Sequence, residues 1–250
     1  MMKREWLHSV VAGAGLIVLT AASAQAQVFQ VSRGDSRQSL SINVGGFFPT
    51  AVDGRIPDDA NDFLDDVLVA NQEVLAFDIE DFRNVSFGAD YLFGIGDFLE
   101  GGVGAGFYQK EVPSVYRDVT YPSGAEIQQD LKLRIVPITA TIRFLPLGRG
   151  AAVEPYVGGG VGINAFRYSE FGDFVDFRDN SIFTARFVKS GTAVGPVLLG
   201  GVRIPVGDAL SVGGELRWQK ARGDLGDDDF LATKINLGGT TANFTIQFRF

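Results

Sequence analysis

The sequence predicts an all-β chain: an eight-stranded antiparallel transmembrane up-and-down β-barrel, with short turns at one end and long loops at the other. Three observations predict this fold. Apolar and polar side chains alternate strictly over residues 243–250, and the chain ends on Phe250. Long and short connections alternate between the predicted strands, and the first residues resemble an export signal. Because successive side chains of a strand point to opposite faces, strict alternation gives each strand one apolar face and one polar face.

Composition excludes several classes of protein. The 250 residues are 46% apolar and include 32 glycines, 21 phenylalanines and no cysteine. Without cysteine the chain has no disulfide, no thiolate nucleophile and no lipoprotein anchor. The net charge of -8 argues against a nucleic-acid partner, because contacts with phosphates need a basic surface.

The N-terminus has the three parts of a secretory signal. Lys3 and Arg4 are positive, residues 10–22 are apolar, and 24–26 (AQA) supply small residues for cleavage after Ala26. No later stretch approaches the 18 consecutive apolar residues of a membrane-spanning helix. Such a chain is either soluble in the periplasm or beyond, or it spans a membrane as a barrel. Together with the strand pattern below, this divides the chain into a signal peptide (1–26), a periplasmic lead-in (27–38) and an outer-membrane barrel (39–250).

Eight segments alternate with period two and are predicted to be strands. They are 39–48, 83–93, 98–108, 129–144, 152–166, 189–204, 210–219 and 243–250. The long connections 49–81, 110–128, 167–183 and 220–233 alternate with short turns, as they do in transmembrane barrels. Apolar residues at helical spacing predict a short helix within 49–81.

One strand departs from simple alternation. Lys132 and Arg134 fall on one parity of segment 129–144, whereas Arg143 falls on the other. A one-residue β-bulge near Val136-Pro137 would bring these charges to the same face, and proline is tolerated at bulges.

Two stretches carry a resemblance to OmpA/OmpX-type eight-stranded bacterial outer-membrane proteins. They are the strand segment 155–160 (PYVGGG) and the terminal Phe248-Arg249-Phe250, and the resemblance covers 39–250. It implies a bacterial outer-membrane location, short periplasmic turns and long outer loops. It also implies a monomer surrounded by outer-membrane lipid and lipopolysaccharide, with a C-terminal strand, ending at Phe250, that the barrel-insertion machinery reads. The peptidoglycan-binding domain that follows the barrel in OmpA is expected to be absent.

Aromatic side chains fall on the predicted lipid-facing parity near the ends of strands, where interfacial girdles form. They are Phe87, Tyr91, Phe93, Phe107, Phe144, Trp218, Phe248 and Phe250. The alternative is that they form the core of a soluble β-sandwich.

Charged side chains fall on the opposite, lumen-facing parity and predict a network of ion pairs. They are Asp90, Glu100, Arg143, Glu154, Arg203, Glu215, Arg217 and Arg249. By strand order we expect Arg143 between Glu100 and Glu154, and Arg203 between Glu154 and Glu215. Because side chains fill an eight-stranded barrel and buried charges require partners, we expect a lumen closed by salt bridges.

Catalysis and cofactor binding find no support in the sequence. The single histidine, His8, lies in the signal, so the mature chain lacks the usual general base. The glycine runs 102–106 and 158–162 lack phosphate-loop spacing. The acidic stretches 58–81 and 224–229 are interpreted as solvated surface, with divalent-cation binding as the alternative. We expect no enzyme activity, cofactor or metal site.

The sequence therefore favours a structural, non-catalytic barrel with a closed lumen and acidic surface loops. The first alternative is a narrow channel or small-molecule carrier that uses a glycine-lined lumen. A second is an adhesin acting through the outer loops, where Arg222-Gly223-Asp224 matches a cell-adhesion tripeptide.

Overall fold

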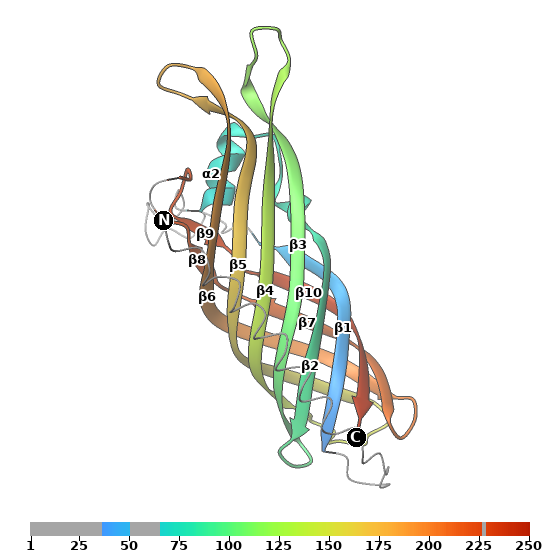
Figure 1. Cartoon of the computed structure of the whole chain (residues 1–250). Helices are drawn as coiled ribbons and strands as arrows, with labels where there is room; N and C mark the ends of the chain where they lie inside the picture. Colours follow the sequence, from blue (N-terminus) through green and yellow to red (C-terminus); the bar gives the residue numbers. More distant parts are fainter. Residues whose placement is uncertain (1–36, 51–65, 227–228) are drawn as a thin grey trace, which may run out of the picture. The chain divides into compact units, whose positions relative to one another are not determined.

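Eight antiparallel strands form a closed ring in the computed structural model, which describes residues 37–50, 66–226 and 229–250. The ring strands are β1 (Gln38–Pro49), β2 (Asn84–Gly94), β3 (Leu99–Thr120), β4 (Glu126–Phe144), β5 (Glu154–Asp176), β6 (Ser181–Pro205), β7 (Leu210–Gln219) and β10 (Gly239–Arg249). Their order is β1-β10-β7-β6-β5-β4-β3-β2, and β1 pairs with β10 and with β2 to close the ring (Figure 1). In a closed ring every strand has a hydrogen-bonding neighbour on both sides, so no strand edge is left open. A sheet in hydrocarbon must be closed in this way, because no water is present there to satisfy unpaired backbone groups. The predicted fold class is confirmed.

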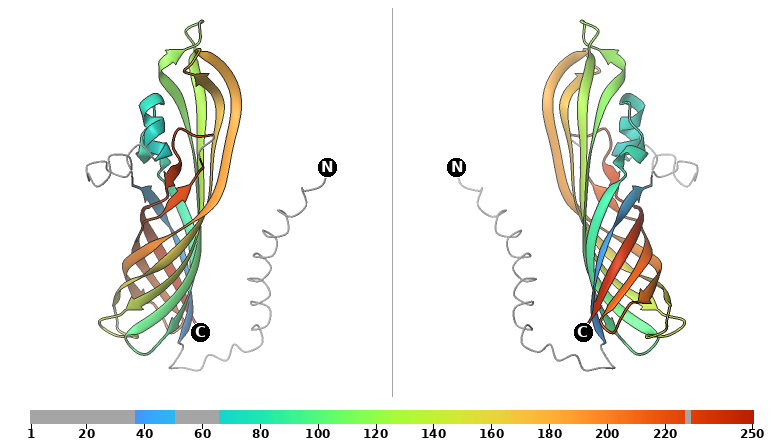
Figure 2. Two further views of the ribbon diagram at one scale, coloured as in Figure 1. Left: turned by 90° about the vertical axis from the view of Figure 1, so that its left-hand side faces the viewer. Right: turned by 90° about the vertical axis from the view of Figure 1, so that its right-hand side faces the viewer.

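Four of the strands are about twice as long as the other four. β3, β4, β5 and β6 contain 22, 19, 23 and 25 residues, whereas a strand needs about 9–11 residues to cross a bilayer. They continue past the remaining strands as two long hairpins (Figures 1 and 2). The prediction that 110–128 and 167–183 are loops was therefore wrong. The outward side chains become polar there while the ladder continues, so the end of the apolar stripe was mistaken for the end of the strand.

The predicted β-bulge at Pro137 was also wrong. β4 pairs with β5 in one register over its whole shared length, and its register with β3 is the same on both sides of Pro137. Arg143 points inward and is buried, whereas Arg134 is exposed and Lys132 is half-buried on the outward parity. No change of parity is needed, because at Lys132 and Arg134 the outward face of β4 is no longer apolar and can carry charged side chains.

A short helical segment fills the ring at the end that carries the long strands. It contains α2 (Val67–Val74) and the 3-10 helix η1 (Ile79–Phe82), so the predicted helix within 49–81 is confirmed. α2 lies on the inner side of the long strands (Figure 2). Asp66 starts the helix, since its Oδ1 accepts a hydrogen bond from the Leu68 amide at 3.0 Å. Its Oδ2 accepts one from the Asn236 amide at 3.1 Å, and this ties α2 to the short pair β8 (Arg222–Asp224) and β9 (Lys234–Asn236).

The polarity of the interior changes along the barrel. Around α2 and η1 the interior holds a cluster of apolar, fully buried side chains, which include Val67, Leu75, Phe82, Ile127, Leu131, Leu133 and Ile135. Towards the short turns the inward side chains are charged. The apolar cluster plugs one end, and the charges occupy the segment that the outer surface marks as membrane-spanning.

Candidate functional site

The outer surface of the ring is apolar on all eight strands. Exposed outward residues include Ile42, Val44, Phe87, Phe93, Val103, Phe107, Ile138, Ile142, Val157, Val161, Val194, Leu198, Val202, Ile204, Leu216, Trp218, Phe244 and Phe248 among others. The eight aromatic side chains predicted for this surface are all exposed. An exposed apolar surface of this extent indicates contact with lipid or with another apolar surface. A ring that is apolar outside and charged inside has the pattern of a membrane-spanning β-barrel. A closed ring also excludes the two packed sheets of the sandwich alternative.

The apolar surface ends at a row of polar side chains. Gln109, Arg134, Arg167 and Ser190 are register partners across β3, β4, β5 and β6, and all four are exposed. Beyond this row the outer face of these strands mixes charged side chains, as in the ion pair between Lys132 and Glu111 at 2.8 Å, with the exposed Phe171 and Val188. The row therefore marks where these four strands leave the hydrocarbon.

Five charged residues form one group near the short turns, here called the turn-end cluster: Glu100, Arg149, Glu154, Arg203 and Arg249. Arg203 donates to both oxygens of Glu100, at 2.7 and 2.9 Å, and to Glu154 at 2.5 Å. Arg249 reaches Glu154 at 2.9 Å from the last strand, and Arg149 reaches Glu100 at 3.5 Å. Glu100, Glu154 and Arg203 are at most 4% exposed, so this is a buried network.

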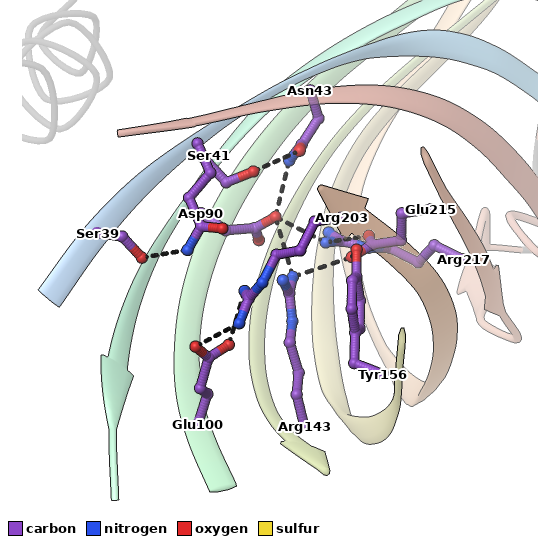
Figure 3. Close-up of polar contacts among 11 residues, drawn as sticks. Ser39, Ser41, Asn43, Asp90, Glu100, Arg143, Tyr156, Arg203, Glu215 and Arg217 are labelled. Carbon is purple, nitrogen blue, oxygen red and sulfur yellow. Dashed lines mark hydrogen bonds and ion pairs between the residues drawn. The ribbon is translucent and has the colours of Figure 1, made fainter. Parts of the chain in front are cut away.

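A second group, the mid-barrel cluster, consists of Asp90, Arg143, Glu215 and Arg217 (Figure 3). Arg217 lies 2.8 Å from both carboxylates, and Arg143 lies 3.4 Å from Asp90 and 3.1 Å from Glu215. Asn43 donates a further hydrogen bond to Asp90 at 2.7 Å. Two carboxylates and two guanidinium groups thus balance each other inside the ring.

Tyr156 separates the two clusters and contacts both. The guanidinium carbons of Arg143 and Arg203 lie 5.1 and 5.6 Å from the centroid of its ring, which is within the range of cation–π attraction. Its hydroxyl donates to Glu215 at 3.1 Å (Figure 3). Neither Tyr156 nor Arg149 was predicted from the sequence. Tyr156 is on the lumen-facing parity and was identifiable, whereas Arg149 lies in a turn, where parity gives no signal.

All eight sequence-predicted lumen residues lie in these two clusters, but three of the four expected pairings, Arg143 with Glu100, Arg143 with Glu154 and Arg203 with Glu215, are wrong. Arg143 is a register neighbour of Glu100, yet it pairs with Asp90 and Glu215. Arg203 pairs with Glu154 as expected, but its second partner is Glu100 and not Glu215. In a narrow barrel a long arginine side chain reaches strands on the far side of the ring, so strand order does not determine its partner.

Glycines bring the charged groups closer together. A Cβ at Gly104 would lie 1.9 Å from Asp90 Oδ1, and one at Gly201 would lie 2.5 Å from the hydroxyl oxygen of Tyr156. The space that these glycines leave is therefore filled by the clusters. Beyond the mid-barrel cluster lies a cavity of about 50 Å³, whose lining includes Asn43, Thr139 and Arg217. This volume holds only a few water molecules.

A much larger pocket, here called the outer pocket, lies at the end with the long strands. Its volume is about 420 Å³, and α2, β3, β4, β5, β6 and residues 229–231 line it. Five phenylalanine rings contribute to the wall: Phe174, Phe177, Phe183, Phe187 and Phe230. This pocket was not predicted from the sequence, because most of its residues fall in segments that were predicted to be loops.

Glu170 supplies a buried carboxylate to the outer pocket. It lies on β5 beyond the polar row and is 3% exposed. Asn71 and Tyr168 donate to one oxygen at 2.6 and 2.9 Å, and Gln129 donates to the other at 3.2 Å. Burial raises the pKa of Glu170, and the three neutral donors only partly oppose this effect.

The remaining sequence hypotheses concern the outer connections. Gly223 of the Arg222-Gly223-Asp224 tripeptide is buried, because β8 pairs with β9. No group of three metal-ligating side chains occurs among the described residues, and much of the acidic stretch 58–81 falls outside them, as do 227–228. The predicted signal peptide also lies outside the described residues. In the described part of the chain no helix has the length and hydropathy needed to span a membrane.

Comparison with known proteins finds similarity only among solved structures. No family model and no curated protein matches the sequence. OprG of Pseudomonas aeruginosa matches with 13% identity and a TM-score of 0.49, covering 87% of this chain and 98% of that one. The N-terminal barrel domain of OprF from the same organism matches at 11% identity and 0.40, covering 86% and 98%. A major outer membrane protein of Thermus thermophilus matches at 14% and 0.45, covering 85% and 99%. At these values the matches say nothing about function, and the fold rests on the chain's own structure: a closed eight-stranded antiparallel β-barrel that is apolar outside and charged inside.

Proposed function

We propose that this chain is a non-catalytic barrel of the bacterial outer membrane with a lumen closed by ion pairs, and that it acts through its outer end. The observation that carries the proposal is the pair of charged clusters across the lumen. Removing one partner from a buried pair costs about 3–5 kcal/mol, so a hydrated ion cannot displace these side chains cheaply. The adjoining cavity of about 50 Å³ is too small for a conduit.

Conductance across planar bilayers tests the closed lumen. We expect the purified barrel to insert without discrete, salt-dependent current steps, while a general porin in the same bilayers conducts. Swelling of proteoliposomes in small neutral solutes should likewise match that of protein-free liposomes. Current steps that scale with KCl concentration would instead favour the channel alternative.

The absence of catalysis is part of the same proposal. The sequence contains one histidine, at position 8 within the predicted signal, and no cysteine. A hydrolase of the usual acid–base or nucleophilic kind would lack its central group in the mature chain. The adhesin alternative gains no support, because Arg222-Gly223-Asp224 is held in a strand pair with its glycine buried.

Export and insertion are supported by the two ends of the chain. The predicted signal with cleavage after Ala26 would direct the chain out of the cytoplasm. β10 presents Phe244, Ile246 and Phe248 on the lipid-facing parity and closes the ring against β1. We therefore assign recognition by the barrel-insertion machinery to this strand, which leads to Phe250.

Lipopolysaccharide is the proposed lipid partner at the outer end. Arg134 and Arg167 are exposed register partners just beyond the apolar surface, and neither has an acidic partner among the described residues. Like charges directly opposite each other are destabilising unless an anion lies between them. Arg186 lies further out on the same outer face of β6, opposite Phe171. Phosphate groups of outer-leaflet lipopolysaccharide have the charge and the depth to bridge these arginines.

A further inference from the structure

The outer pocket combines apolar walls with an unusual polar floor. Its volume of about 420 Å³ is in the range of pockets for small molecules. Phe174 and Phe187 pack edge to face at 4.9 Å between ring centroids, and Phe174 stacks on Phe183 at 5.9 Å. These contacts hold the rings in place and make an aromatic wall that is ordered before any ligand arrives.

The floor offers hydrogen-bond acceptors. Among the described residues no lysine or arginine pairs with Glu170, whose only donors are Asn71, Tyr168 and Gln129. Gln129 is 3% exposed, and its Oε1 has no hydrogen-bond partner. A buried acceptor without a donor is destabilising, so the floor is incomplete as it stands. The missing group is a donor, and a positive donor would suit the carboxylate best.

The other groups that line the pocket agree with a cationic ligand. Aromatic rings attract cations through their π faces, most strongly where water is excluded. Asp176 and Asp229 also line the pocket, against one arginine, Arg178. An anion would meet the carboxylates, and a wholly apolar molecule would leave the Gln129 oxygen without a donor.

We propose that the outer pocket binds a small organic ammonium ion. Its N–H groups donate to Glu170 and Gln129, and its hydrocarbon body packs on Phe174, Phe183 and Phe187. This inference goes beyond the closed barrel, because it makes the outer end a binding site for a specific class of ligand. The two stand independently, since a barrel with a closed lumen can bind or fail to bind such an ion.

Binding of three matched probes to the full-length mature barrel in lipid nanodiscs tests the proposal. The probes are 2-phenylethylammonium, 2-phenylethanol and 3-phenylpropionate, which share a phenyl ring and differ in the charge of the head group. Calorimetry should show the ammonium ion binding about tenfold more tightly than the alcohol, because a charged hydrogen bond is worth more than a neutral one. The carboxylate should bind more weakly than either. Equal affinities for the ammonium ion and the alcohol would overturn the proposal.

Two variants locate the effect. Glu170→Gln should abolish the preference for the ammonium ion over the alcohol, whereas Glu126→Gln should retain it. Glu126 is an exposed carboxylate at the same end of the barrel and does not line the pocket, so it controls for net charge. Phe183→Leu, at a 45% exposed wall residue, should weaken both ligands without disturbing the buried polar groups. A preference that persists in a folded Glu170→Gln barrel, with heat-modifiable mobility on a gel, would contradict the assignment.

Discussion

Arg143 illustrates how much depends on single side chains in the lumen. It is 2% exposed and lies between Asp90 and Glu215. Arg143→Ala would leave two buried carboxylates with Arg217 as their one positively charged partner. Breaking a buried ion pair costs about 3–5 kcal/mol. We expect this loss in the free energy of unfolding, measured by urea titration of the barrel in lipid vesicles.

Arg186→Ala is the matched control for this measurement. Arg186 is exposed on the outer face of β6 and has no partner among the described residues. Its removal should change the unfolding free energy little, as exposed charges usually do. Equal stabilities of Arg143→Ala and wild type would show that the mid-barrel cluster contributes no pairing energy.

At this scale the sequence identifies the lumen charges but only one of their pairings, that of Arg203 with Glu154. Side-chain parity alone places Asp90, Arg143 and Glu215 inside, because a strand alternates its faces. Which carboxylate an arginine contacts depends on distances across the ring, which no local pattern contains. Tyr156 falls on the same parity, yet its place between two guanidinium groups follows only from the closed structure.

Among the elements, α2 depends on its capping residue. Asp66 accepts hydrogen bonds from the amides of Leu68 and Asn236, so it both starts the helix and ties it to β9. Asp66→Ala should destabilise this segment by about 0.5–2 kcal/mol, the usual cost of losing an N-cap. Hydrogen exchange should then be faster in α2, while the amides of the ring strands are unaffected.

Glu73→Ala on the same helix provides the comparison. Glu73 is exposed and makes no hydrogen bond or ion pair among the described residues. Exchange in α2 should stay at the wild-type rate in this variant. If the two substitutions accelerated exchange equally, helix propensity and not the cap would control the segment.

The long strands show why the lengths of elements were the least predictable feature. The sequence indicates where the outward face of β3 to β6 stops being apolar, and that boundary coincides with the row at Arg134 and Arg167. It does not indicate whether the ladder stops there. The strands continue because Leu131, Leu133 and Tyr168 still pack inward against the helical plug, a contact between segments far apart in the chain.

For the whole molecule, the arginine pair on the outer face predicts how the barrel contacts its membrane. Arg134→Ser and Arg167→Ser should each weaken binding of lipopolysaccharide about fivefold, because a basic side chain near an anionic lipid surface contributes about 1 kcal/mol. Binding is measured with fluorescent lipopolysaccharide added to the barrel in detergent micelles. Dephosphorylated lipopolysaccharide should bind equally weakly to wild type and both variants.

Arg178→Ser controls for the loss of charge, since Arg178 is exposed between β5 and β6 and lies outside the row. The affinity of the Arg178→Ser variant for lipopolysaccharide should equal that of the wild-type barrel. Indistinguishable affinities across all three variants and wild type would argue against a phosphate site at Arg134 and Arg167.

The sequence by itself determined the strand count, the apolar outer face and the set of charges inside, because each follows from period-two alternation within a strand. The tertiary structure alone decided the pairings of Arg143 and the second partner of Arg203. It also decided how far the four long strands extend, and that Glu170 and Gln129 meet five phenylalanine rings in one pocket. These features arise when strands far apart in the chain are brought together around a ring, and the distances between them are set by the closure of that ring and by what fills it.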